Sequence, residues 1–317
     1  LFSASSLRLE TGLAMTPYYK KQLLWGAFGF CGMIFFMLFD YRHLKNIAWP
    51  VFWITIILLA IVPFWGETIS GAKRWVDLGF FNIQPSELAK LSVLLLGAKI
   101  LSHLPGIIDW KNLGKLLLIG ALPAALIINQ PDLGSGLNLI LLLGGMIMFK
   151  GVQKSVFKPL AFIVPLLAPV GWFFLHDYQK QRILTFLHPD KDPLGAGYHI
   201  LQSQIAIGSG RLWGKGFLGG TQSQLRFLPE KHTDFAFAVF GEEWGFAGCI
   251  VLLSLFCFFL YQIAMVAQES KDSFGCFLSA GVFFYFFWQI LINIGMVLGL
   301  MPVVGIPLPF FSYGGSS

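Results

Sequence analysis

The sequence predicts an all-α membrane protein that crosses the bilayer many times and keeps its polar chemistry in loops and helix ends on one side. Of its 317 residues, 56% are apolar, 16% are aromatic and only 12% are charged. Soluble domains are roughly 45–50% apolar and about 25% charged. A chain with so little charge lacks the polar surface that covers a globule in water, so much of its surface must face lipid.

A membrane-spanning helix needs about 20 mostly apolar residues. Eight segments of the chain meet or approach this length, and polar residues separate them. These segments are 23–39, 47–65, 86–104, 116–129, 136–149, 159–175, 235–263 and 274–298.

The segments 116–129 and 136–149 are short for full spans, and they flank the polar run from Gln130 to Ser135. Two helices joined at a polar turn, or one helix broken there, would both give this pattern. The stretch 176–235 is by contrast a loop of about 60 residues with glycine, proline, histidine and charges. Loops of that length in compact proteins are usually functional. The sequence has no internal repeat to support a transporter built from inverted repeats.

Lysine and arginine counts in the short loops predict the orientation. Eight lie in one group of loops, and five lie in the other. Because cytoplasmic loops carry the excess of basic residues, the richer group is predicted to be cytoplasmic. The richer group is 40–46, 105–115, 150–158 and 263–275, and the poorer group is 7–22, 66–85, 130–135 and 299–317. The long loop 176–235 then shares the outer side with the poorer group.

The net charge of +6 comes from basic residues beside apolar segments. Such residues orient a membrane protein and meet anionic head groups, so we expect no nucleic-acid partner. We expect a single polytopic domain over 1–317 that is trimmed at both ends. Residues 1–6 are typical of the end of an apolar segment, and 314–317 stop within a predicted helix mouth.

Charged residues are rare in membrane segments, and Glu87 and Lys90 are therefore informative. They are three residues apart on a helix that begins at Pro85 and Ser86, two good helix-start residues. One interpretation is an ion pair that merely permits insertion. The other is a polar wall that lines a cavity.

Asp132 and the loop around Arg74 offer a second set of candidates. Asp132 lies between two apolar runs, where it is either a helix N-cap or a carboxylate that meets Lys90, a metal ion or substrate. Arg74 presents a planar fork suited to phosphate. Lys73 and Trp75 flank it, and this combination suits a lipid-linked sugar phosphate, although tryptophan at this depth is commonly an interfacial anchor.

The long loop ends at Asp234, where apolar sequence begins. A carboxylate in that position is partly desolvated, which tends to raise its pKa and suits a general base. The alternative is a helix N-cap. His232 either tunes this carboxylate or faces water. Two further acids, Glu242 and Glu243, follow in the next helix, and one of them is expected to face a polar interior.

These segments together resemble the SEDS family (shape, elongation, division and sporulation) of membrane peptidoglycan glycosyltransferases. The resemblance covers essentially the whole chain, and the long loop is similar to that of the RodA, or elongation, branch. The motifs that carry it are Gly71-Ala72-Lys73-Arg74-Trp75, Gln84-Pro85-Ser86-Glu87-Leu88-Ala89-Lys90, Gln130-Pro131-Asp132-Leu133-Gly134, Leu228-Pro229-Glu230-Lys231-His232-Thr233-Asp234-Phe235 and Pro307-Leu308-Pro309-Phe310-Phe311-Ser312-Tyr313-Gly314-Gly315-Ser316.

The resemblance implies about ten transmembrane helices in the full protein and an active site on the extracytoplasmic face of the bacterial cytoplasmic membrane. It implies polymerisation of lipid II into glycan strands, with a class B penicillin-binding protein and the elongation machinery as partners. The family's essential carboxylate maps to Asp234. Substrate-binding positions map to Lys73, Arg74, Trp75, Gln84, Glu87, Lys90, Asp132 and His232.

The implied reaction inverts the donor's anomeric centre, so a single general base suffices, and the hypothesis assigns this role to Asp234. Mg²⁺ or another divalent cation would assist the leaving pyrophosphate, although no motif is dedicated to a metal. Two rival functions are open at this point. One is a lipid II flippase, and the other is a non-catalytic scaffold for a penicillin-binding protein.

Overall fold

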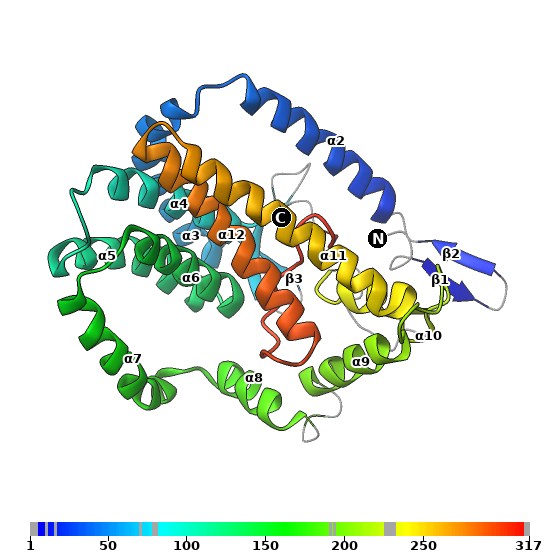
Figure 1. Cartoon of the computed structure of the whole chain (residues 1–317). Coiled ribbons are helices and arrows are strands. Elements are labelled where there is room, and N and C mark those ends of the chain that lie inside the picture. Colours follow the sequence, from blue (N-terminus) through cyan, green and yellow to red (C-terminus); the bar gives the residue numbers. More distant parts are fainter. Residues whose placement is uncertain are drawn as a thin grey trace.

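The computed structural model describes residues 6–9, 12–15, 18–69, 72–77, 82–189, 192, 195–224 and 233–313. Helices dominate it (Figure 1). They are α2 (Tyr18–Met37), α3 (Leu44–Trp65), α4 (Pro85–His103), α5 (Trp110–Asn129), α6 (Leu133–Lys150), α7 (Lys154–Phe174), α8 (Asp177–Leu187), α9 (Ala196–Ser209), α10 (Thr221–Gln224), α11 (Ala236–Glu269) and α12 (Ser273–Val297).

Each of the eight predicted spans is helical, which confirms the all-α, multi-pass architecture. Among the described residues, five helices are long and apolar enough to cross a membrane by length and composition. These are α5, α6, α11, α12 and the helix over Tyr41–Trp65 that contains α3. The count of ten helices stays a prediction, and the expected remnant at 1–6 lies outside the described residues except for Ser6.

The expectation that 116–129 and 136–149 are short is wrong. They belong to two separate helices of 20 and 18 residues. The predicted segments began too late along the chain. Helix α5 already begins in the polar residues after Asp109, and α6 begins directly after Asp132. Both aspartates are N-caps whose side chains accept a backbone N–H, which is how a helix start satisfies its unpaired donors.

Helix α11 has 34 residues and is broken at Gly245, where φ is 65°. The loop after α9 fills the break. Phe246 N–H donates to the Arg211 carbonyl at 2.8 Å, and Ala247 N–H donates to the Leu212 carbonyl at 3.0 Å. The freed backbone groups of the break are thereby satisfied, as a helix at membrane depth requires.

The core lies where α4 packs between α3, α6 and α12. Its fully buried side chains include Leu96, Leu116, Leu142 and Met146. Figure 1 shows α2 and α7 at the periphery of this bundle. A second cluster joins the N-terminal half of α11 and the C-terminal half of α12 to the C-terminal segment 302–308, which has no regular secondary structure.

The loops gather at two ends of the bundle in the groups that the sequence predicted. At one end, Tyr41 donates to Asp272, and Lys150 Nζ donates to the Leu104 carbonyl at 2.8 Å. At the other end, Arg74 donates to the Pro131 carbonyl, and Gly134 packs against Val304. The loop 66–85 therefore meets the turn at 130–132, and the start of α6 meets the C-terminal segment.

Short strands also occur, which the sequence did not predict. Strands β1 (Ser6–Leu9) and β2 (Gly12–Met15) pair as a hairpin, and β3 (Glu67–Ile69), β4 (Ala72–Asp77) and β5 (Asn82–Ile83) form an antiparallel sheet. The long loop is structured, as predicted, because it contains α8, α9 and α10. Helix α9 is fixed to the end of α12 by Ser203 Oγ, which donates to the Val297 carbonyl at 2.8 Å.

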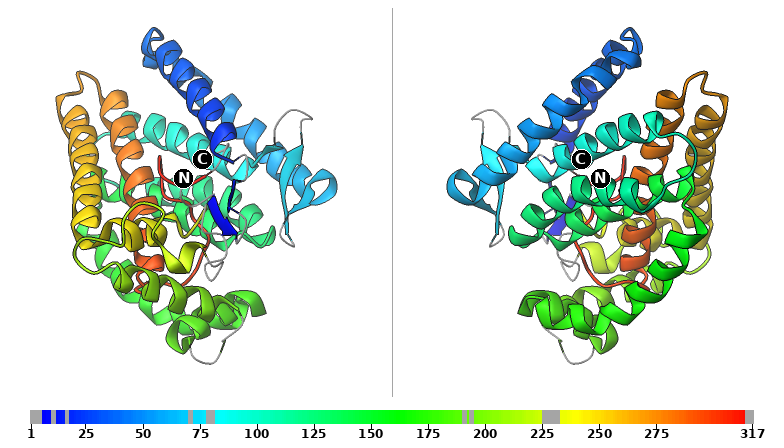
Figure 2. Two further views of the ribbon diagram at one scale, coloured as in Figure 1. Left: turned by 90° about the vertical axis from the view of Figure 1, so that its right-hand side faces the viewer. Right: turned by 90° about the vertical axis from the view of Figure 1, so that its left-hand side faces the viewer.

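The C-terminal segment lies between α11 and the α4–α6 region in both views of Figure 2. A Cβ atom at Gly134 would stand 2.4 Å from the Val304 carbonyl oxygen, so α6 and this segment touch through a glycine.

Gly134→Ala is expected to destabilise the protein by about 1–3 kcal/mol, because the added methyl overlaps backbone that cannot rotate away. Gly144→Ala in the same helix is the matched control, since nothing lies within 4 Å of a Cβ there. The measurement is the thermal midpoint of both variants in detergent. Equal midpoints would contradict the close contact between α6 and the C-terminal segment.

Candidate functional site

Strand β4 presents Arg74 to the turn between α5 and α6. The Arg74 guanidinium donates to the Pro131 carbonyl, and its Nη1 lies 4.0 Å from Asp132 Oδ1. The register between β3 and β4 shifts at Arg74, since Thr68 pairs with Lys73 and Glu67 pairs with Trp75, so Arg74 is the extra residue of a β-bulge. Lys73 is exposed and Trp75 is half-buried. The structure thus brings Arg74 to the turn at Pro131 and Asp132.

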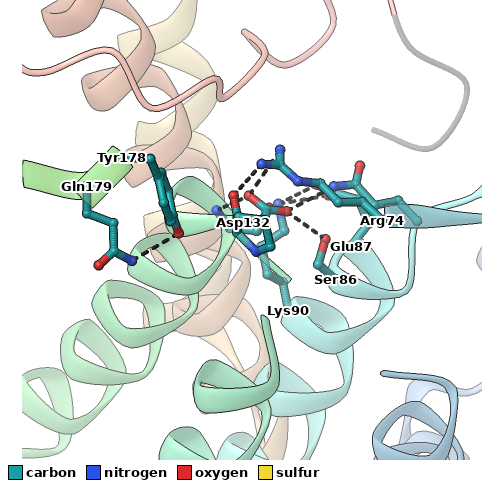
Figure 3. A network of polar contacts seen from close by, with 10 residues as sticks. Arg74, Ser86, Glu87, Lys90, Asp132, Tyr178 and Gln179 are labelled. Carbon is teal, nitrogen blue, oxygen red and sulfur yellow. Dashed lines mark hydrogen bonds and ion pairs between the residues drawn. The ribbon is translucent and has the colours of Figure 1, made fainter. Parts of the chain in front are cut away.

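Asp132 connects three parts of the chain (Figure 3). Its Oδ1 accepts the Ser135 N–H at 3.2 Å, which makes it the N-cap of α6. Its Oδ2 accepts from Gln84 Nε2 at 3.1 Å and from Ser86 Oγ at 3.3 Å. The N-cap interpretation and the site interpretation are therefore both correct, because the carboxylate has enough lone pairs for both.

Glu87 and Lys90 form a buried ion pair with an N–O distance of 2.8 Å. They are only 9% and 2% exposed. Tyr285 of α12 closes the pair, since its ring centroid lies 5.4 Å from Lys90 Nζ and its hydroxyl lies 3.5 Å from Glu87 Oε2. Together with Ser86 and Asp132, this pair continues the polar contacts from Arg74 along the first turns of α4.

Asp234 lies in the turn just before α11 and is half-buried. The N-cap of α11 is Phe235, one residue after Asp234, so Asp234 does not occupy the predicted N-cap position. The carboxylate faces the backbone of Gly305, where a Cβ atom would stand 3.4 Å from Asp234 Oδ2. The carboxylate is thus held beside the C-terminal segment.

Arg182 of α8 is a candidate that the sequence analysis missed. It is half-buried, and its guanidinium interacts electrostatically with Arg74, Asp132 and Asp234. Burial and the neighbouring Arg74 charge lower the pKa of Arg182 from its ordinary value. A lone arginine in a helix of the long loop carried no sequence signal, because only the fold brings it to the other three side chains.

Glu242 confirms the expectation that one of the two acids on α11 faces a polar environment. It is fully buried, and its Oε1 accepts from Lys215 Nζ at 2.7 Å and from the Gln222 N–H at 3.0 Å. Thr221 Oγ1 adds a third contact at 3.1 Å. These contacts fasten the end of the long loop to α11. His232 lies outside the described residues.

The sequence matches the family described as "Cell cycle protein", which comprises FtsW, RodA and SpoVE, over residues 1–317. The chain belongs to the FtsW/RodA/SpoVE family. The resemblance to SEDS proteins that the motifs indicated is thereby confirmed.

The relatives include peptidoglycan glycosyltransferase MrdB of Escherichia coli, which is 46% identical over 83% of this chain and 72% of the relative. MrdB of Helicobacter pylori strain J99 is 39% identical over 94% of this chain and 78% of the relative. A probable FtsW of Trichlorobacter lovleyi is 35% identical over 100% of this chain and 84% of the relative.

Two solved structures share the fold of this FtsW/RodA/SpoVE member. One is a chain from a study of polymerization and crosslinking by a peptidoglycan synthase complex, with a TM-score of 0.81, 31% identity and coverage of 94% of this chain and 84% of that chain. The other is RodA of Thermus thermophilus, with a TM-score of 0.68, 28% identity and coverage of 96% and 83%.

The side chains at this end of the molecule are suited to an anionic ligand rather than to a resident metal. Within the described residues, no three histidine, cysteine or acidic side chains form a group that could hold a metal ion. Asp132 already accepts hydrogen bonds on both oxygens. Arg74 and Arg182 instead supply two planar cations beside two carboxylates, and such forks bind phosphate oxygens well.

Lys90→Met is expected to destabilise the protein by about 3–5 kcal/mol, because Glu87 is left as a buried charge without its cation. Lys90→Met combined with Glu87→Gln is expected to recover part of this loss, since no ionised group is then stranded. Thermal midpoints in detergent give the comparison. A double variant no more stable than Lys90→Met alone would contradict the pairing.

Proposed function

We propose that this chain is a peptidoglycan glycosyltransferase of the RodA type that polymerises lipid II during cell elongation. We place the reaction on the extracytoplasmic face of the bacterial cytoplasmic membrane. The observation that carries the proposal is the convergence of Arg74, Asp132, Asp234 and Arg182 at one end of the bundle, in a chain related to proteins named as peptidoglycan glycosyltransferases.

In the proposed reaction, the 4-hydroxyl of the acceptor N-acetylglucosamine attacks the anomeric carbon of the donor N-acetylmuramic acid. A carbon–oxygen bond forms there as the bond to the pyrophosphate oxygen breaks on the opposite face. Asp234 takes the hydroxyl proton, and undecaprenyl pyrophosphate leaves. One displacement inverts the centre, so one base is enough. The half-buried position of Asp234 supports this role, because it limits competing solvation of the carboxylate.

Arg74 and Arg182 neutralise the charge that develops on the leaving pyrophosphate. The proposal keeps Lys73 and Trp75, which flank Arg74 in β4, as contacts for the sugar or lipid of a bound substrate. The apolar surfaces of the helices would accommodate the polyprenyl chain. Mg²⁺ or another divalent cation would enter with the substrate, with a carboxylate of the site among its ligands, and would help to neutralise the leaving pyrophosphate.

The contacts of Asp132 with Gln84 and Ser86 and the Glu87–Lys90 pair keep the start of α4 in place beside the substrate. In this proposal, Gln84, Glu87, Lys90 and Asp132 shape the site. His232 stays a proposed contact on the strength of its motif alone.

A class B penicillin-binding protein is the proposed transpeptidase partner, together with the elongation machinery. The support is the similarity to a chain from a peptidoglycan synthase complex whose description names both polymerization and crosslinking. The partner would cross-link the strands that this chain polymerises.

Two rivals share some of this support. The buried Glu87–Lys90 pair would also suit a lipid II flippase, and the helical surface would suit a scaffold. A polymerase makes long glycan from lipid II in detergent. A flippase shows no activity there, because its assay needs two compartments separated by a membrane. A scaffold catalyses no reaction.

Asp234→Asn is expected to abolish polymerisation, because the amide cannot accept the hydroxyl proton. The assay incubates purified protein, with and without its transpeptidase, with fluorescent lipid II in Mg²⁺ or EDTA and separates the products on a gel. Asp192→Asn, an acid in the same long loop, is the control. Glycan formation by a folded Asp234→Asn variant would exclude this carboxylate as the base.

Arg182→Gln is expected to reduce kcat/KM for lipid II by about 10–100-fold, since one charged donor to the transition state is lost. Lys180→Gln, two residues earlier on α8, removes the same charge without reaching Asp132 or Asp234. Similar losses in both variants would mean that only the overall positive charge of α8 matters.

A further inference from the structure

Asn293 of α12 is a fully buried amide whose two donors are both used. Its Nδ2 donates to the carbonyl of Asp234 at 2.9 Å and to the carbonyl of Ile306 at 2.7 Å. The first carbonyl belongs to the turn that begins α11, and the second belongs to the C-terminal segment 302–308. One side chain thus connects three separate parts of the chain.

The two bonded carbonyls flank the place where the Asp234 carboxylate meets Gly305. Gly305 directly precedes Ile306, has a φ of 72°, and stands opposite Asp234 Oδ2. Asn293 therefore fixes the backbone of Asp234 itself. It also fixes the backbone of Ile306, directly after the glycine that faces the Asp234 carboxylate. A shift of either backbone would move the carboxylate relative to Gly305.

The same segment also extends to the Asp132 side of the site. The Val304 carbonyl packs against Gly134, two residues after Asp132. The segment thus touches the start of α6 through Val304 and the start of α11 through Gly305, and Asn293 fixes it one residue further on. The relative position of the two carboxylates depends on this arrangement.

A buried carbonyl without a donor costs about 1–3 kcal/mol, and an apolar residue at position 293 would leave both carbonyls without this donor. An aliphatic side chain would fit the apolar surroundings of α12 better than an amide does. Asparagine at this depth is therefore explained by the two bonds that it donates.

We propose that Asn293 is a positioning residue for the reaction, which sets the distance and angle of the Asp234 carboxylate to the bound acceptor. This inference rests on the proposed function, in which Asp234 is the base. Asn293 touches no substrate atom, so its loss should affect the chemical step and leave substrate binding unchanged. A displacement of about 1 Å from a remote change can cost about 100-fold in rate.

The test compares Asn293→Ala with Asn293→Ser in the full chain with its transpeptidase. The two side chains are similar in size, but serine keeps one hydroxyl donor. The matched control is Asn138→Ala on α6, because Asn138 is equally buried and its amide atoms have no hydrogen-bond partner in the part of the chain that the structure describes. Thermal midpoint, kcat and KM for fluorescent lipid II are measured for each.

The expected result is a kcat for Asn293→Ala that is lower by about 10–100-fold, an intermediate kcat for Asn293→Ser, and a KM within about twofold of the wild type. Asn138→Ala should keep the wild-type kcat. Equal kcat values for the alanine and serine variants, or a loss confined to KM, would overturn the proposal. If Asn293→Ala unfolds in detergent, Asn293→Ser decides alone: a lowered kcat at normal KM supports the role, and a wild-type kcat overturns it.

The outcome separates two failures. An inactive wild-type protein, or an active Asp234→Asn variant, would overturn the proposed function itself. An active wild type with an inactive Asp234→Asn and fully active Asn293 variants would overturn only the positioning role.

Discussion

The hydrogen bonds to Asp132 are the interaction on which the end of the bundle that holds Arg74 depends. The carboxylate is 5% exposed, and it accepts from the start of α6 and from the residues that begin α4. A buried carboxylate is tolerated only where such donors surround it. Arg74 adds a cation from β4. Because one carboxylate contacts all three, the start of α4, the start of α6 and the strand that carries Arg74 hold a common position.

The same constraint explains why the irregular parts of the chain lie where they do. Backbone that leaves a helix at membrane depth must find its hydrogen bonds inside the protein. The break in α11 finds them in the loop after α9, and the carbonyls of Asp234 and Ile306 find theirs in Asn293. Glu242 then fastens the neighbouring loop through Lys215. The irregular segments are thus built into the bundle, and Asp234 is presented from a rigid support.

Two arginines and two acids from four segments of the chain meet at this end. The two guanidinium groups repel each other, and each is offset by nearby carboxylates. An arrangement of this kind favours a ligand that brings its own negative charge, since the ligand relieves the repulsion between the cations. The buried Glu87–Lys90 pair is different, because its charges already neutralise each other and Tyr285 encloses them.

The sequence by itself determined the membrane architecture, the grouping of loops at two ends, and most of the candidate residues. Apolar runs of spanning length have few alternatives in lipid, and charged residues such as Lys90 and Asp132 stand out against them. Only the tertiary structure decided that Asp132 is both the N-cap of α6 and a shared acceptor for Gln84 and Ser86, and that Asp234 is not at the N-cap position of α11. The tertiary structure alone brings Arg182 and Asn293 close to the site. These side chains are far from their partners in the sequence, and an isolated arginine or asparagine has no periodicity or motif, so their roles follow from packing.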